Sequence, residues 1–201
     1  MIQQQIEFEF GPEQKRRPKR QVPRIKKAIP AAFKSHFESV VVGYGEFFTH
    51  TGKPEDSQLL YWAAIRPATG ESFAAALQPK SLAPECMPSE FYFKKMGIER
   101  EAFVNGLTLS QFEQRWAEFF GPNDILSAWN KITLKYIEKF IPQTNTPLFL
   151  KASYCNHIGG RCGDLKGVLK REALTSMANN GEGRSGFRLG NAASLAQFFH
   201  S

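Results

Sequence analysis

Cysteine is scarce in this chain: three of its 201 residues are cysteine, and their spacing is irregular. An odd number of cysteines without regular spacing excludes the dense disulfide framework of small secreted domains. We therefore expect reduced thiols and a cytoplasmic protein.

Long apolar runs are also absent, because no stretch approaches the roughly 20 uninterrupted apolar residues of a membrane-spanning helix. Residues 1–10 carry glutamine and glutamate where a secretory signal has a basic segment followed by an apolar one. These absences predict a soluble protein that is not secreted and has no membrane partner. The apolar residues, 42% of the chain with 18 phenylalanines among them, are enough for the core of one domain.

Acidic residues are missing from one segment, residues 15–27, although the chain as a whole carries a net charge of +7. Prolines interrupt this segment and its surroundings, so it cannot bury itself and is expected to be an extended arm. We expect residues 1–35 to be a basic, proline-containing tail or linker and residues 36–201 to be a single α/β domain. The basic residues of the arm are Lys15, Arg16, Arg17, Lys19, Arg20, Arg24, Lys26 and Lys27.

Hydrophobic periodicity predicts three consecutive strands at residues 38–48, 58–66 and 71–78. A meander of this kind followed by helix-linked strands predicts a mixed sheet with helices on both faces, in the element order of the ribonuclease H-like fold. A capping box at Ser110 to Glu113 is expected to open the longest central helix. The other expected elements are helices at 89–96 and 99–103, a strand at 124–129, a helix at 131–140, a strand at 148–154 and helices at 164–174 and 189–199.

Four segments carry local similarity to a known set of motifs: 41–46, 96–99, 128–134 and 186–193. Their order along the chain resembles that of the motifs in the DEDD exonucleases, the family of the proofreading exonuclease domains and ribonuclease T. That family has Asp-x-Glu-Thr on its first strand, then Gly-Ile-Thr, His-Asn-x-x-Phe-Asp and His-x-Ala-x-x-Asp. The resemblance covers about residues 38 to 199 and rests on element order and local similarity. The corresponding segments here are 41–46 (Val-Val-Gly-Tyr-Gly-Glu), 96–99 (Met-Gly-Ile-Glu), 128–134 (Ala-Trp-Asn-Lys-Ile-Thr-Leu) and 186–193 (Gly-Phe-Arg-Leu-Gly-Asn-Ala-Ala).

The resemblance also implies which catalytic groups are missing. In the family, four carboxylates hold two divalent metal ions and a histidine acts as the base. One carboxylate and one amide cannot neutralise two dications, so we expect a catalytically inactive domain with no metal and no other cofactor. Carried over by position, the four carboxylates become Tyr44, Glu46, Leu134 and Asn191, and the base becomes Gly186.

A domain of this kind that has lost catalysis is expected to bind or dock nucleic acid, more readily RNA because ribonuclease T-like relatives act on RNA ends. The arm would add salt-sensitive contacts to phosphates, and aromatic side chains would stack on bases. The partner is then RNA or another nucleic acid, with the domain belonging to a larger RNA-processing or RNA-modifying protein. Besides the basic residues of the arm, the expected contact residues are Tyr44, Trp129, Asn130 and Arg161.

Two other functions remain open from sequence. The chain could be a protein-interaction or structural domain whose arm is only a tether. It could instead be a divergent metal-dependent 3'–5' exonuclease, in which Mg²⁺ or Mn²⁺ is held by Glu46 with Asp124 or Asp164.

A zinc site is a further alternative, because Cys155, His157 and Cys162 lie within eight residues, with Cys86 or His50 as a fourth ligand. The lack of a Cys-x-x-Cys pair favours ordinary buried thiols and a loop histidine. The glycine-rich segments 159–164 and 179–186 are expected to be connecting loops. Backbone NH groups at the helix that follows the first of them could also bind phosphate.

Overall fold

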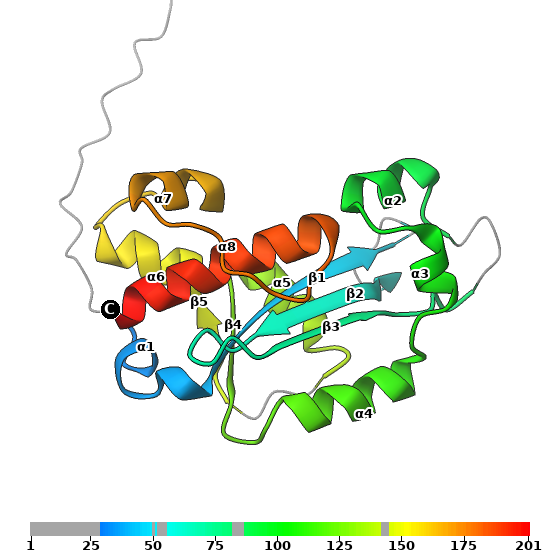
Figure 1. Ribbon diagram of the computed structural model, residues 1–201, viewed down its shortest axis with the longest axis horizontal. Helices are drawn as coiled ribbons and strands as arrows, with labels where there is room; N and C mark the ends of the chain where they lie inside the picture. The colour runs from blue at the N-terminus through cyan, green and yellow to red at the C-terminus, as the bar shows by residue number, and fades with distance from the viewer. Residues whose placement is uncertain (1–28, 50, 52–55, 82–86, 142–144) are drawn as a thin grey trace, which may run out of the picture.

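A computed structural model of the chain describes residues 29–49, 51, 56–81, 87–141 and 145–201. Its centre is a five-stranded sheet in the order β3-β2-β1-β4-β5 (Figure 1). β1 pairs antiparallel with β2 and parallel with β4, and β4 pairs parallel with β5. The strands are β1 (Val40–Phe48), β2 (Gln58–Ile65), β3 (Ser72–Ala76), β4 (Ile125–Ala128) and β5 (Leu148–Phe149). The predicted meander and mixed sheet are confirmed.

Helices cover both faces of the sheet, as predicted. On one face, α4 and α5 pack against Trp62, Leu126 and the alternate residues of β1 to β4. The other face is covered by α8, which crosses the sheet, together with the remaining helices (Figure 1). The helices are α1 (Ala32–Ser35), α2 (Glu90–Met96), α3 (Arg100–Val104), α4 (Leu109–Phe119), α5 (Lys131–Ile137), α6 (Leu150–His157), α7 (Leu165–Arg171) and α8 (Gly183–His200), and a 3-10 turn, η1, spans Phe37–Ser39.

The capping box of α4 begins two residues earlier than the sequence predicted. Thr108, not Ser110, precedes the helix, and its side chain accepts a hydrogen bond from the Gln111 backbone NH at 3.3 Å. The Gln111 side chain accepts from the Thr108 backbone NH at 2.9 Å. Both residues satisfy NH groups that have no partner inside the helix, which explains why α4 begins at Leu109.

The predicted strand at 148–154 is wrong beyond Phe149. α6 begins at Leu150, and its buried residues Leu150, Ser153 and Tyr154 recur at helical spacing. The segment 150–157 therefore follows a period of 3.6 residues instead of 2.

The last helix begins six residues earlier than predicted. α8 starts at Gly183 and includes residues that glycine content had assigned to a loop. A Cβ at Gly183 would lie 2.2 Å from the Met96 carbonyl oxygen, and one at Gly186 would lie 2.0 Å from that of Gly181. These glycines allow close backbone contact, so tertiary packing overrides their low helix propensity.

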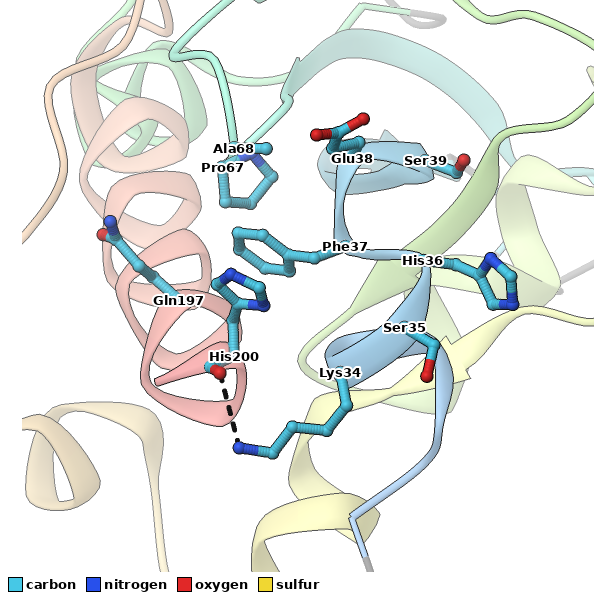
Figure 2. Close-up of a pocket in the computed structure, with 10 residues that line it drawn as sticks. All are labelled: Lys34, Ser35, His36, Phe37, Glu38, Ser39, Pro67, Ala68, Gln197 and His200. Carbon is cyan, nitrogen blue, oxygen red and sulfur yellow. Dashed lines mark hydrogen bonds between the residues drawn. The ribbon is translucent and has the colours of Figure 1, made fainter.

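The predicted boundary between tail and domain, after residue 35, lies too far along the chain. Phe33 on α1 is fully buried, and its ring centroid lies 5.1 Å from that of Phe199 on α8. Figure 2 shows the adjacent pocket, where the Phe37 ring stacks on His200 at 4.2 Å and Lys34 Nζ donates to the His200 carbonyl oxygen at 3.3 Å. A lysine there also complements the negative end of the α8 dipole. The packed domain therefore includes α1. The basic arm, residues 15–27, lies outside the described residues.

No helix among the described residues is both long enough and apolar enough to cross a membrane.

We predict that Phe33→Ala lowers the free energy of unfolding by about 3–5 kcal/mol, because it leaves a cavity between α1 and α8. Phe91→Ala is the matched control: Phe91 is 75% exposed on α2, and its loss should cost no more than about 0.5 kcal/mol. Urea denaturation measures both variants. Equal stability of Phe33→Ala and the parent chain would mean that the domain does not need α1.

Candidate functional site

A cavity of about 410 Å³ opens where β1 and β4 approach their C-terminal ends. This is the edge at which open α/β sheets commonly bind ligands. β1 contributes Tyr44, the segment after β4 contributes Trp129 and Asn130, and α8 contributes Asn191. These four sequence-predicted positions are therefore brought together. The remaining lining residues are Asp164, Leu165, Lys166, Phe187 and Arg188.

Asn191 is the most distinctive polar group of this cavity. It is only 4% exposed, and it lines the cavity. The cavity therefore offers an amide donor and acceptor to a bound molecule.

Glu46 does not face the cavity as a free carboxylate. It is 4% exposed and accepts a bidentate pair of hydrogen bonds from Arg184, from Nε at 2.9 Å and Nη2 at 2.5 Å. The Ser185 hydroxyl donates a third bond at 3.2 Å. Two parallel bonds to a guanidinium satisfy and neutralise both carboxylate oxygens.

A second arginine from α8 repeats this arrangement two residues earlier on β1. Arg188 Nη1 donates to the Tyr44 hydroxyl at 2.5 Å, and its guanidinium lies 5.5 Å above the Tyr44 ring. Residues two apart on a strand share a face, as do residues four apart on a helix. Arg184 and Arg188 are thus placed opposite Glu46 and Tyr44 by the periods of the two elements.

Two tyrosines from neighbouring elements, Tyr61 on β2 and Tyr92 on α2, form hydrogen bonds beside this contact. The Tyr61 hydroxyl accepts from the Glu182 backbone NH at 2.8 Å, immediately before α8. The Tyr92 hydroxyl donates to the Phe47 carbonyl oxygen at 2.9 Å. Burial, and then the nearby charge of Glu46, raise the pKa of Tyr92 to about 12. Burial is also the first cause of the raised pKa of Tyr44, again followed by Glu46.

Two more lining residues, Trp129 and Asp164, have defined partners. Lys151 Nζ lies 5.7 Å from the centre of the Trp129 ring. The Asp164 carboxylate accepts from the Gly167 backbone NH at 2.8 Å and so caps α7. Lys166, in the first turn of α7, also lines the cavity.

Other predicted positions do not join the cavity. Leu134 is buried in the core cluster on the opposite face of the sheet, because the turns of α5 direct it inward. Gly186 lies inside α8 against Gly181, where no side chain fits. Asp124 precedes β4, at the end of the sheet away from Glu46, and pairs with Arg66 at 2.6 Å. Arg161 lies on the exposed connection between α6 and α7. Leu134, a position carried over by the resemblance, therefore lies in a different cluster from Tyr44.

The proposed zinc ligands do not form a group of three or more within the described ranges. Cys155 and His157 lie on α6 instead of on one face of a strand. The His157 ring packs against Tyr154 and Phe198, with centroid distances of 6.3 and 5.8 Å. Three or more histidine, cysteine or acidic side chains do not gather in a metal-binding group anywhere within the described ranges. His50 and Cys86 lie outside them.

The residues present do not fit the two metal ions of the DEDD chemistry. Mg²⁺ and Mn²⁺ need anionic oxygen ligands. At the four carried-over positions this chain has a phenol hydrogen-bonded to Arg188, a carboxylate neutralised by Arg184, an amide and a buried leucine. The guanidinium of Arg184 holds both oxygens of the remaining carboxylate.

Sequence reasoning missed four residues of this site: Lys166, Arg184, Phe187 and Arg188. Arg184 lies in segment 179–186, which was predicted to be a loop, and Phe187 and Arg188 lie before the predicted helix start at 189. The glycines of this part of α8 hid the i, i+4 spacing of the two arginines. That spacing, together with Tyr44 and Glu46 two apart on a strand, is the signal that could have found them.

We predict that Arg184→Met destabilises the fold by about 3 kcal/mol, because it leaves the Glu46 carboxylate buried without its partner. Adding Glu46→Gln should recover most of this loss, since a neutral amide needs no cation. As a control, Arg100→Met breaks an ion pair that is exposed on both sides and should cost less than about 1 kcal/mol. Denaturation of Arg184→Met, Glu46→Gln, the double variant and Arg100→Met tests this coupling, and additive effects of the two site substitutions would contradict it.

We also predict a loss of stability in strongly alkaline solution to which Tyr92 contributes. The folded-state pKa of Tyr92 is about 12, whereas an unfolded tyrosine titrates near 10. The folded state therefore holds the proton longer, so stability is constant below about pH 10 and falls between about pH 10 and 12. Tyr92→Phe should make this fall shallower in urea denaturation across the alkaline range. Identical slopes for the two proteins would contradict the prediction.

Comparisons with protein-family models and with curated proteins find no match. Solved structures do match. The nuclease domain of 3'hExo, a DEDDh family member, bound to rAMP, is similar with a TM-score of 0.60 and 14% identity over 82% of this chain and 90% of that one. Exonuclease X in complex with 5' overhanging duplex DNA has a TM-score of 0.58 and 10% identity over 80% and 90%.

Larger exonucleases match over part of their length. For the E. coli Exonuclease I complex with a 5cy-dA13 oligonucleotide, the TM-score is 0.51 and the identity 16%, over 80% of this chain and 39% of that one. Because the sequence identities are this low, the structural matches establish the fold alone. The chain therefore has the ribonuclease H-like fold of the DEDDh exonuclease domains, as its element order predicts.

Proposed function

We propose that this chain is a catalytically inactive exonuclease-like domain that binds single-stranded nucleic acid, preferably RNA, in the cavity between Tyr44 and Asn191. The observation that carries the proposal is the bidentate pair between Arg184 and Glu46. It places a fixed positive charge on the one carboxylate that remains of the four that the DEDD reaction uses.

Loss of the metal ligands leaves a cavity with binding chemistry. Tyr44, Trp129 and Phe187 supply aromatic surface, and Phe187 is 56% exposed. Every base has a flat face that stacks on such rings, worth about 1–3 kcal/mol per base. The Asn191 amide, which lines the cavity, supplies a donor and an acceptor for a base edge or a sugar hydroxyl.

Charge around the cavity favours an anionic chain. Lys166 and Arg188 line the cavity, and Lys131 is exposed just outside it. The lining carboxylate, Asp164, is already engaged in capping α7. Lys and Arg contacts to phosphates release counterions and give salt-dependent affinity. The basic residues of segment 15–27 would extend such contacts along the nucleic acid.

Several similar structures are described with nucleic acids or nucleotides. One concerns 3'-end specific recognition of histone mRNA stem-loop by 3'-exonuclease, with a TM-score of 0.65 and 12% identity over 84% of this chain and 65% of that one. Another holds rAMP, and a third holds duplex DNA. We infer nucleic acid as the ligand class from these and from the cavity, and RNA as the preferred member from the first two. A cytoplasmic location and membership of a larger RNA-processing or RNA-modifying protein are part of the same proposal.

Fluorescence anisotropy with labelled single-stranded RNA and DNA of one sequence, in the presence of EDTA, tests the proposal. We expect binding without metal that weakens steeply with salt, and a shallower salt dependence when residues 15–27 are deleted. Trp129→Ala should lose about 1–3 kcal/mol of binding free energy, roughly 5- to 150-fold in Kd.

Arg188→Gln should also weaken binding. Its matched control is Arg115→Gln, which removes the same charge from an exposed position on α4, on the opposite face of the sheet. Equal affinity of the two charge variants would argue for a protein-interaction or structural domain whose arm alone attracts nucleic acid. Degradation of the oligonucleotide in Mn²⁺ that disappears in Glu46→Gln would instead establish the divergent nuclease.

A further inference from the structure

Two free thiols meet at one side of the cavity, and the proposed binding of nucleic acid uses neither of them. The Cys155 thiol, on the last turns of α6, donates to Cys162 Sγ over 3.0 Å. A disulfide bond is about 2.0 Å long. The two sulfurs are therefore neighbours in direct contact, and a small approach of one toward the other would allow a bond.

The turn that ends α6 brings the two cysteines together. The Gly160 NH donates to the Cys155 carbonyl oxygen at 3.0 Å, and the Gly159 NH donates to that of Asn156 at 3.2 Å. This pair of bonds is the Schellman arrangement, and Gly159 has the required positive φ of 66°. The chain reverses there and returns Cys162 to the side of the helix that carries Cys155.

The two thiols differ in access. Cys162 is 3% exposed, whereas Cys155 is half-buried. Burial, and then the hydrogen bond with Cys155, raise the pKa of Cys162 to about 11. The thiolate is the attacking form of cysteine. Cys155 is therefore the thiol that an external reagent meets first, and Cys162 is placed to react second.

The connection that contains Cys162 continues directly into the cavity wall. Asp164, Leu165 and Lys166 line the cavity, two to four residues after Cys162. On α6, the same helix that carries Cys155, Lys151 lies over the Trp129 ring at 5.7 Å. A bond between the cysteines would therefore join the two elements that hold this side of the cavity.

We propose that Cys155 and Cys162 form a reversible dithiol–disulfide site that takes a glutathione-type disulfide as its oxidant and, when oxidised, tethers the wall formed by Asp164, Leu165 and Lys166 to α6. The Cys155 thiolate attacks one sulfur of the oxidant, forms a mixed disulfide and releases one glutathione thiolate. The Cys162 thiolate then attacks Cys155 Sγ and releases the second. The two cysteines lose two electrons, and the oxidant disulfide is reduced to two thiols.

The experiment uses the full chain with Cys86→Ser, so that no third thiol takes part. The protein is incubated with oxidised glutathione, and the remaining thiols are alkylated. The products are digested with trypsin and analysed by mass spectrometry. Because trypsin cleaves after Arg161, the expected product is a disulfide that joins peptides Ala152–Arg161 and Cys162–Lys166. Dithiothreitol should separate them again.

Two further substitutions, each made in the Cys86→Ser protein, test the order of attack. Cys162→Ser should stop at the mixed disulfide of Cys155 with glutathione, whereas Cys155→Ser should stay largely unmodified under the same conditions. Equal glutathione labelling of both variants would overturn the assigned order. In the Cys86→Ser protein, absence of the joined peptides, or a stable mixed disulfide in their place, would overturn the site itself.

Amide hydrogen exchange tests whether the disulfide restrains the segment that contains Cys162. Amides of residues 161–171 should exchange more slowly in the oxidised Cys86→Ser protein than in its reduced form, and amides of α4 should not change. A disulfide that leaves exchange of 161–171 unaltered would overturn the tethering. These measurements need no nucleic acid, so they separate this proposal from the proposed function.

Discussion

The contact between β1 and α8 depends on one buried ion pair, that of Glu46 with Arg184. A carboxylate that is 4% exposed requires a partner, and the partner comes from a helix 138 residues later in the chain. Once this bond is made, the first turn of α8 lies over the middle of the sheet. Tyr61 then reaches the backbone before the helix, and Gly183 fits against the end of α2. The position of Asn191, two turns further along, follows from this alignment.

The same interaction links the architecture to the proposed function. In the DEDD reaction, cations between carboxylates balance negative charge and activate water. Here guanidinium groups supply the positive charge, and they are covalently part of the protein. Such a group can balance charge and donate hydrogen bonds, but it cannot polarise a bound water as a metal ion does. A fixed cation next to aromatic rings suits binding of a phosphate chain better than its cleavage.

Much of the fold follows from local patterns in the sequence. β1 and β2 are apolar over nearly their whole length and have turn residues around them, so their existence and order could be predicted. The errors arise where tertiary contact decides. Gly183 and Gly186 weaken a helix by propensity, yet close backbone packing places both inside α8. Phe33 sits next to a basic, proline-rich stretch, and only the distant Phe199 shows that it is buried.

The site could be predicted in part for the same reason. Tyr44, Trp129 and Asn191 follow from motif positions at strand ends and on the last helix. The four-residue spacing of Arg184 and Arg188 indicates a shared face only once α8 is known to begin at Gly183. Leu134 was misplaced because a motif position carries no information on which way the side chain points once the local helix turns.

The contact of Gly186 with Gly181 has an evolutionary consequence. The resemblance to the DEDD motif carries the catalytic base over to Gly186, and a Cβ there would lie 2.0 Å from a backbone oxygen. A histidine could not be regained by one mutation, because the whole turn before α8 would have to be rebuilt first. Because Arg184 also binds the Glu46 carboxylate, several simultaneous changes would be needed to assemble the metal-dependent reaction here. Under the proposed function, the close packing of one glycine therefore blocks a stepwise route to that reaction, and selection would act on what the cavity binds.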